Sequence, residues 1–322
     1  MKDGGENATY SGGDFVAPEI ALHRFPGDAI LVSSSSFEVD VSGVRVAEQS
    51  HPFQLERRRE VAPISEVDTA EVIEGEHLLI GRWGHRTWGH WLGELLPKIA
   101  LVEEMYPGRF SYITSVMPFA AKSEPGVRDA WTSYRESLEA LGIDGSRITA
   151  MPRGRAVRFE AWYGVDPVYV SGVFHPAALA MMKDRAVRDL NSESSKIAVI
   201  SRKGGSRGLA NATEVSDVVA DAGFSLLDPG SMSFGEQVAH FASARHVIGI
   251  LGSGLTGAIF GPRGIRVLAL GPERFSDRFF YGITRARQGL FFDLRGESQG
   301  DDPRLSPFLV DCRALTEMLQ SF

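Results

Sequence analysis

The chain has 322 residues, of which 43% are hydrophobic and 23% are charged, with 35 Gly and 16 Pro. This composition is typical of a globular protein, and the length is sufficient for two domains of about 150 residues each. The net charge of -7 and the pI of 5.7 argue against nucleic acid or an anionic membrane as the main partner, although basic patches can still form locally. The single cysteine, Cys312, excludes an intrachain disulfide and a zinc site built from cysteines.

The first 20 residues do not have the pattern of a targeting segment. They are rich in Gly, Ser and Asp, which predicts a flexible tail, and they lack the apolar region of a secretion signal. The rest of the sequence contains no run of about 18 apolar residues, so it predicts no membrane span. We therefore expect a cytoplasmic protein with at most peripheral membrane association.

The segment from Asp28 to about Leu55 contains short β-type stretches divided by Ser and Gly, which predicts a small antiparallel sheet. Three consecutive arginines follow at Arg57, Arg58 and Arg59. Such a run can hold a phosphate, but a solvated face is the favoured interpretation.

The segment from His77 to Pro107 predicts a short strand, a loop and an amphipathic helix. His90 and Glu94 are four residues apart near the start of this helix, so they share one of its faces. A histidine held by a carboxylate can act as a general base. A surface pair or a helix cap is the alternative, and the spacing alone favours that alternative.

Aromatic residues gather around this pair, at Trp83, His85, Trp88 and Trp91. Large aromatic side chains with polar neighbours suit either a domain interface or a wall on which a sugar stacks. We expect Trp88 and Trp91 to line a cleft.

The pattern then alternates between strand and helix, which predicts a βαβ style of domain. Strands are expected at residues 110–116, 146–152 and 156–165, and helices at 125–141 and 175–190. The polar segment NSESSK is the best candidate for an interdomain linker, with a boundary near Ser192. The expected domains are residues 21–191 and residues 192–322.

The sequence pattern of the second domain predicts a doubly wound parallel sheet of the α/β class. The strands KIAVISR, FSLLD, HVIGIL and IRVLAL alternate with helices, and the tail predicts a short strand and a helix capped by Asp311. The pairs Ser233 with Glu236 and Asn211 with Glu214 have capping-box spacing. Ligands of such sheets bind at the carboxyl ends of the strands, which here carry Arg202, Asp228 and the glycines after HVIGIL.

The segment from His246 to Phe260, HVIGILGSGLTGAIF, predicts a buried strand that turns sharply into a helix. Free backbone N–H groups at such a turn favour an anion, most often a phosphate. Gly252, Gly254 and Gly257 also match the G-x-G-x-x-G pattern of dinucleotide sites, with Glu273 about 20 residues further on. An NAD-dependent oxidoreductase is therefore an alternative, but the pattern follows two earlier βα units and its helix is cut short at Gly261.

Three blocks in order, HWLGELLPKIALVEE, SRKGGSRGLANATEV and FGEQVAHFASARHVIGILGSGLTGAIFGPRG, resemble the successive motifs of glycosyltransferase family 61, the capsular-polysaccharide biosynthesis group. The resemblance covers about residues 80–270. It implies a GT-B fold, in which two Rossmann-like domains face each other across a cleft. It also implies inverting, metal-independent transfer of a sugar from a nucleotide sugar, most often a nucleoside diphosphate sugar, to a glycan or lipid-linked glycan acceptor, with no cofactor and no nucleic acid.

The resemblance also assigns site residues. His90 and Glu94 match the family's His-Trp-Leu-x-Glu positions and are the expected catalytic residues, and either could remove the acceptor proton. Cations and N–H dipoles would stabilise the departing diphosphate. The expected donor site comprises Arg202, Arg207, Asp228, Gln237, Gly252, Ser253, Gly254 and Leu255.

The glycine turn departs from the family's usual G-x-H-G-A-G-L-x-N pattern. Leu251 stands at the His position, Ser253 at the Ala position and Gly257 at the Asn position. A missing charged hydrogen bond to the diphosphate would weaken its binding by about 1.5–3 kcal/mol. A non-catalytic protein that binds a nucleotide or a glycan is therefore a second hypothesis.

Overall fold

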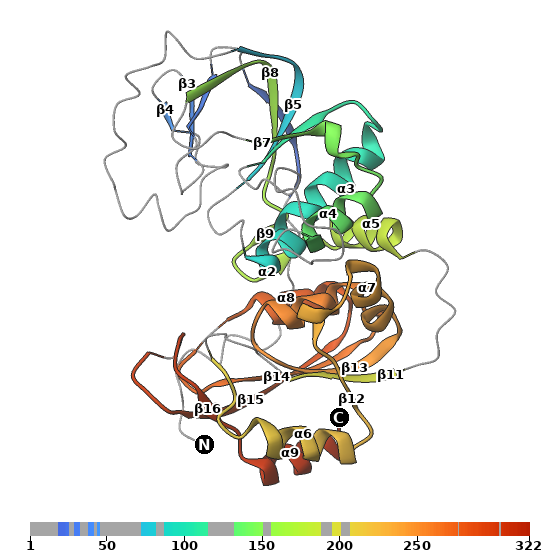
Figure 1. Cartoon of the computed structure of the whole chain (residues 1–322), viewed down its shortest axis with the longest axis vertical. Helices are drawn as coiled ribbons and strands as arrows, with labels where there is room; N and C mark the ends of the chain where they lie inside the picture. Colours follow the sequence, from blue (N-terminus) through green and yellow to red (C-terminus); the bar gives the residue numbers. More distant parts are fainter. Residues whose placement is uncertain are drawn as a thin grey trace. The chain divides into compact units, whose positions relative to one another are not determined.

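The structure is a computed structural model of the 322-residue chain. It describes residues 19–25, 29–32, 38–41, 44–45, 72–81, 87–114, 132–150, 156–187, 195–200, 207–275, 277–302 and 304–322. Chain packing separates one compact unit at residues 18–168 from another at residues 169–322 (Figure 1). Both units contain helices and parallel strands, which confirms the α/β class.

The N-terminal unit is built on one mixed sheet. Its strands are β1 (Leu22–Phe25), β2 (Ala29–Val32), β3 (Glu38–Val41), β4 (Val44–Arg45), β5 (Val72–Ile80), β6 (Ser111–Thr114), β7 (Ile148–Ala150) and β8 (Ala156–Val165). Strands β7, β6, β5 and β8 are parallel neighbours, in the order 3-2-1-4 that is found in Rossmann folds. The antiparallel strands expected near residues 28–55 extend this same sheet, because β2 pairs with β8.

Helices of this unit follow the parallel strands. They are α2 (Trp88–His90), the π-helical turn η4 (Trp91–Leu95), α3 (Leu96–Met105), α4 (Thr132–Ala140) and the short 3-10 turn η5 (Gly145–Arg147). Helix α4 is followed by Gly142, whose φ of +79° is the left-handed conformation that commonly ends a helix. The expected end of this helix at Gly142 is confirmed, whereas most of its expected first half lies outside the described residues.

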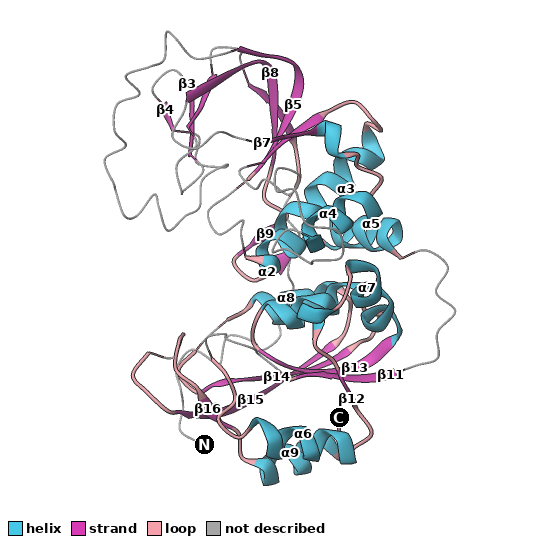
Figure 2. Ribbon diagram, in the orientation of Figure 1, coloured by secondary structure: helices cyan, strands magenta, loops and turns pink. Residues whose placement is uncertain are grey.

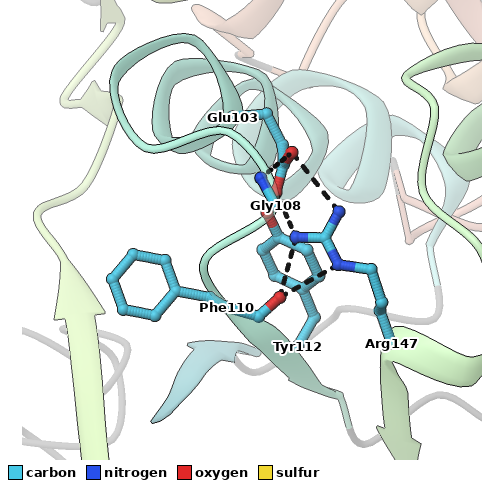
Figure 3. A network of polar contacts seen from close by, with 5 residues as sticks. All are labelled: Glu103, Gly108, Phe110, Tyr112 and Arg147. Atoms are coloured by element: carbon cyan, nitrogen blue, oxygen red, sulfur yellow. Dashed lines mark hydrogen bonds and ion pairs between the residues drawn. The ribbon is translucent and has the colours of Figure 1, made fainter.

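A buried polar network ties α3 to the sheet of this unit (Figure 3). The Glu103 carboxylate accepts hydrogen bonds from Arg147 Nη2 at 2.5 Å, from the Gly108 N–H at 3.2 Å and from the Tyr112 hydroxyl. Arg147 also donates to the Phe110 carbonyl. Burial alone would raise the pKa of Glu103, but these hydrogen bonds outweigh it and lower that pKa.

Glu103→Gln should lower the free energy of unfolding by about 3–5 kcal/mol, because it leaves Arg147 without its buried partner. The carboxylate's contribution is present above the pKa of the unfolded chain and is lost as the pH falls through the lowered folded value. Urea unfolding at pH 7 and at pH 3 measures both effects. The control is Glu104→Gln at the exposed neighbouring position of the same helix, and an equal loss in both variants would contradict the role of the network.

The C-terminal unit contains a doubly wound sheet, as expected. Its strands are β11 (Ser195–Val199), β12 (Ser225–Leu226), β13 (Ala244–Ile250), β14 (Arg266–Pro272), β15 (Leu290–Ser298) and β16 (Phe308–Leu309), in the order β12-β11-β13-β14-β15-β16. All neighbours are parallel except β15 and β16. The strand order reverses at β11. The switch point, at which such sheets bind ligands, therefore lies between the carboxyl ends of β11 and β13.

Helices cover both faces of this sheet (Figure 2). Helices α6 (Ala212–Asp221) and α9 (Cys312–Leu319) pack on a core that includes Ile248, Ile250 and Leu268. The opposite face carries α7 (Phe234–Ser243), the 3-10 helix η7 (Ser253–Phe260) and α8 (Phe279–Ala286). Alternate residues of each strand therefore point to different helical layers.

Two of the three expected helix caps in this unit form. Ser233 and Glu236 make the capping box of α7, and Asp311 accepts hydrogen bonds from two N–H groups at the start of α9. Asn211 is the exception, since its side chain makes no cap hydrogen bond. It binds the backbone N–H and carbonyl of Val310 instead, so it joins the start of α6 to the segment after β16.

The unit also includes the hairpin of β9 (Tyr169–Val170) and β10 (Val173–Phe174) and helix α5 (Pro176–Ala186). Lys183 of α5 donates to the Gly261 carbonyl at the end of η7, at 2.9 Å. The compact unit therefore begins before the expected boundary near Ser192, which itself lies outside the described residues. Of the described helices, none is both long and apolar enough to cross a membrane.

Candidate functional site

The glycine turn lies at the carboxyl end of β13, beside the switch point. Within the turn and η7, only Ser253 and Gly254 reach the surface, and the residues on either side are buried. No described residue accepts a hydrogen bond from the backbone N–H of Ser253 or Gly254, and no side chain caps η7. The turn therefore offers two adjacent backbone donors on partly exposed residues, as an anion site requires.

Glycine is needed in this turn because other atoms lie close to its backbone. A Cβ at Gly254 would lie 3.0 Å from Val199 Cγ1 at the end of β11, and a Cβ at Gly249 would lie 2.8 Å from Leu255 Cδ1. A Cβ at Gly257 would overlap the ring of Phe241, which is buried in α7. Close packing of the turn onto β11 and α7 thus explains these glycines without a dinucleotide.

Gly257→Ala should lower the free energy of unfolding by about 1–3 kcal/mol, because the new methyl group overpacks against Phe241. The penalty should be smaller in a Phe241→Leu background, where space is available. Gly235→Ala is the control, since a Cβ there meets nothing within 4 Å. Urea unfolding of the four proteins and the double variant measures the coupling, and an unchanged penalty in the Leu background would refute it.

Two leucines of the turn face the core. Leu255 was expected to bind the donor, but its side chain is fully buried and its N–H donates to the Gly252 carbonyl at 2.9 Å. Leu251 is also fully buried and lies against Gly271 of the neighbouring strand β14. Leu255 is therefore a packing residue, and the exposed part of the turn is Ser253 and Gly254.

Arg207 is a half-buried cation on the same edge of the sheet. Its guanidinium lies 4.4 Å from the centre of the Phe275 ring, and its one side-chain hydrogen bond to a described residue is long, from Nη1 to the Arg304 carbonyl at 3.4 Å. No carboxylate of the described chain forms an ion pair with it. Burial lowers the pKa of this guanidinium, and Asp277 opposes the shift only partly. An arginine desolvated without a partner is suited to an anionic ligand.

The backbone of Arg207 supports the same interpretation. Its φ of +60° is uncommon for a residue with a side chain, and its N–H is bound to the Leu305 carbonyl at 3.2 Å. Such conformations often mark functional positions. The other arginine expected at this site, Arg202, lies outside the described residues.

Asp228 and Gln237 hold the loop between β12 and α7. Asp228 accepts from the Gly230 N–H at 3.2 Å, and Gln237 Nε2 donates to the Pro229 carbonyl at 3.0 Å and to the Met232 carbonyl at 3.3 Å. A Cβ at Gly254 would lie 3.9 Å from Pro229. Both side chains therefore position the loop that borders the glycine turn.

Three charged residues on this edge were not expected from the sequence. Arg295 of β15 binds Asp293 Oδ2 at 2.6 Å and donates to the carbonyls of Pro272 and Phe275 in the loop after β14. Burial raises the pKa of Asp293 and of Asp277. Arg295 thus holds in place the loop that carries Phe275, whose ring lies against the Arg207 guanidinium. The only signal in the sequence was a pair of charges within the apolar stretch LFFDLRG.

In the N-terminal unit, His90 and Glu94 form the expected pair. His90 Nδ1 and Glu94 Oε1 are 2.6 Å apart, and the His90 side chain is 32% exposed against 6% for Glu94. A buried carboxylate at this distance fixes the orientation of the imidazole. When Nδ1 carries the hydrogen that Glu94 accepts, Nε2 is the nitrogen that can take up a proton.

The pair lies where the helix changes its winding. Glu94 belongs to the π-helical turn η4, in which the Leu96 N–H donates to the Trp91 carbonyl five residues earlier. Pro97 follows directly and has no N–H for the carbonyl of Gly93, so the regular hydrogen bond of an α-helix is missing there. π-Helical turns are frequent at functional sites.

The two expected cleft tryptophans have different environments. Trp91 is 1% exposed and its indole N–H donates to Ser137 Oγ at 2.9 Å, so it belongs to the core rather than to a cleft wall. Trp88 is partly exposed and packs edge-on against Tyr134. Trp83 and His85 lie outside the described residues. Among the side chains that the structure describes, no three of the types His, Cys, Asp and Glu are grouped as metal ligands.

The family model Glycosyltransferase 61 matches residues 88–268, which is more than half of the chain. The matched region runs from α2 into β14 and contains both the His90–Glu94 pair and the glycine turn. No curated protein matches the sequence.

Two solved structures are similar over most of their length. The E. coli heptosyltransferase WaaC with ADP has a TM-score of 0.36 and 9% identity, over 77% of this chain and 97% of that chain. The iron-containing dodecameric glycosyltransferase TibC from enterotoxigenic E. coli has a TM-score of 0.33 and 13% identity, over 87% of this chain and 82% of that chain.

Proposed function

Because the chain belongs to glycosyltransferase family 61 and is therefore a glycosyltransferase, we propose the following reaction. A sugar is transferred from a nucleoside diphosphate sugar to a glycan or lipid-linked glycan acceptor, with inversion and without a metal, in the cytoplasm and for polysaccharide synthesis. The family assignment favours this reaction over dinucleotide chemistry at the same glycines.

The observation that carries the proposal is the glycine turn at the switch point. Ser253 and Gly254 are partly exposed and carry two backbone donors without a described acceptor, and Arg207 provides a cation on the same edge of the sheet that pairs with no described carboxylate. A diphosphate that leaves during transfer gains negative charge, and donors already in place stabilise it in the transition state. We therefore assign the donor diphosphate to the turn and to Arg207.

We assign the acceptor's proton to the His90–Glu94 pair. An inverting transfer needs a base that deprotonates the attacking hydroxyl. His90 is the more exposed partner, so we propose that its imidazole takes the proton, while the buried Glu94 orients the ring and stabilises the imidazolium. The balance is simple: the acceptor oxygen bonds to the sugar carbon, the nucleoside diphosphate leaves with the bonding electrons, and the proton moves to His90.

A thermal-shift screen against UDP, GDP, CDP, dTDP, CMP and NADH tests the donor site. A ligand that binds only the folded chain raises its stability by RT ln(1 + [L]/Kd), or about 2.7 kcal/mol at 100-fold excess over Kd. We expect a rise in Tm with one nucleoside diphosphate. A rise with NADH alone would restore the dinucleotide interpretation and refute the proposal.

A nucleotide-binding protein without turnover is the second candidate. Leu251 and Gly257 are its basis, because the first fills the core and the second leaves no room for a side chain beside Phe241. Donor hydrolysis by the wild type and by Glu94→Gln separates the two candidates. A lower rate in the variant with an unchanged donor Kd supports the enzyme, whereas binding without turnover in either protein supports the second candidate.

A further inference from the structure

The amino ends of the central strands of the C-terminal unit carry basic side chains in one row. Lys196 of β11 is the register partner of His246 of β13, and His246 is the register partner of Arg266 of β14. Register partners in neighbouring strands lie about 4.8 Å apart and project from the same face. Arg245 directly precedes His246, so it projects from the opposite face of β13 and adds a fourth basic group at the same end of the strands.

No carboxylate of the described chain neutralises this row. Lys196, Arg245 and Arg266 each lack an ion pair with any described residue. Aromatic rings hold two of them in place: Lys196 Nζ lies 5.4 Å from the centre of the Phe224 ring, and the Arg266 guanidinium lies 5.2 Å from that of Phe292. Like charges opposite one another destabilise a sheet. The chain therefore keeps an unfavourable cluster of positive charge here, although its net charge is -7.

The neighbourhood of His246 is consistently positive. Burial lowers the pKa of His246, and Arg266, Lys196 and Arg245 lower it further. Among the described residues, no acidic group is one of those that act on it. The described residues therefore leave this edge with a positive potential.

Apolar surface adjoins the same row. Beyond Arg266, the next register partner is Leu290 of β15, whose side chain is 55% exposed. Lys196 and Arg245 are exposed as well. The edge thus combines cations with an exposed leucine, as surfaces that bind at the boundary between lipid headgroups and acyl chains do.

We propose that this basic edge, formed by Lys196, Arg245, His246 and Arg266, binds the anionic headgroups of a phospholipid surface. The row spans three strands, or about 10 Å, so its charges are spread too widely to converge on one phosphate but match an extended array of phosphates. The glycine turn lies at the other end of β13, a strand of seven residues, roughly 20 Å away. Lipid binding at the basic edge therefore leaves the turn uncovered.

Co-sedimentation of the full chain with vesicles tests the proposal. We expect binding to vesicles that contain phosphatidylglycerol, no binding to vesicles of phosphatidylcholine alone, and loss of binding in 1 M salt, where the screening length is about 3 Å. The double variant Lys196→Gln with Arg245→Gln should bind about 25-fold more weakly, at about fivefold for each cation removed.

Two matched variants serve as controls. Arg313→Gln removes a charge from an 88% exposed position on α9 and should bind like the wild type, as should the charge-conserving Lys196→Arg. Equal binding to neutral vesicles, or unchanged binding by the double variant, would overturn the proposal. Binding of inorganic pyrophosphate at these residues without any vesicle binding would overturn it too. The experiment needs no sugar donor, so its result is independent of the proposed reaction.

Discussion

Replacing His90 by Gln should lower kcat for sugar transfer by about 100- to 10,000-fold and leave the Kd of the donor nucleotide unchanged. Glutamine can still donate a hydrogen bond to Glu94, but it cannot take up the acceptor's proton. The loss should therefore fall on the chemical step and not on donor binding, because the donor is assigned to the other unit of the chain. Single-turnover transfer rates and nucleotide titration measure the two quantities separately.

Glu94→Gln should lower kcat in the same direction, since we assign to Glu94 the positioning of His90 and no contact with the acceptor. Glu94→Asp keeps the charge and should restore part of the rate, which a purely structural role would not predict. Because Glu94 is 4% exposed, the Tm of each variant must be recorded to exclude unfolding. Glu104→Gln, at an exposed position of the same helix, is the control. Wild-type kcat in both His90→Gln and Glu94→Gln would remove the pair from the mechanism.

Arg207→Met should weaken nucleoside diphosphate binding by about 10- to 150-fold, the equivalent of ~1.5–3 kcal/mol for a charged hydrogen bond. The ligand-free protein should be as stable as the wild type or more stable. Methionine can still pack on the Phe275 ring, and the variant no longer half-buries a cation that forms no ion pair with a described carboxylate. Calorimetric titration and thermal unfolding without ligand measure the two effects, which have opposite signs.

Arg304→Gln is the control for this experiment, because it removes a nearby exposed charge without removing the half-buried guanidinium. A general loss of positive potential would weaken binding in both variants, whereas a specific contact weakens it in Arg207→Met alone. A Kd within twofold of the wild type in Arg207→Met would show that the diphosphate does not bind there.

Local patterns predicted the C-terminal sheet up to β14. Alternation of apolar runs with helical spacing identified β11, β13 and β14, and the capping box of Ser233 formed as its spacing indicated. Helix α8 and strand β15 were missed, because β15 carries Asp293 and Arg295 on the face that packs under the helices. These two charges are two residues apart on the same face of β15 and pair with each other, and charged residues at such positions interrupt the apolar signal on which strand prediction depends.

Parts of the site depended on contacts distant in sequence. The i and i+4 spacing was sufficient to predict that His90 and Glu94 would meet, because that contact is local. The same sequence could not show that Trp91 is buried, since its partner Ser137 is 46 residues away. Nor could it show that Asn211 binds Val310 instead of capping its own helix. Spacing indicates which residues share a face, but the tertiary fold decides what covers that face.

Pro97 has a consequence for the register of the helix that carries His90 and Glu94. A π-helical turn holds one residue more than an α-helical turn, so η4 acts as a single-residue insertion into an otherwise regular helix. Each residue of a helix advances by about 100°, and the insertion therefore rotates everything before it by that angle relative to α3. Deletion of Gly93 should therefore turn His90 away from its present direction while α3 keeps its packing.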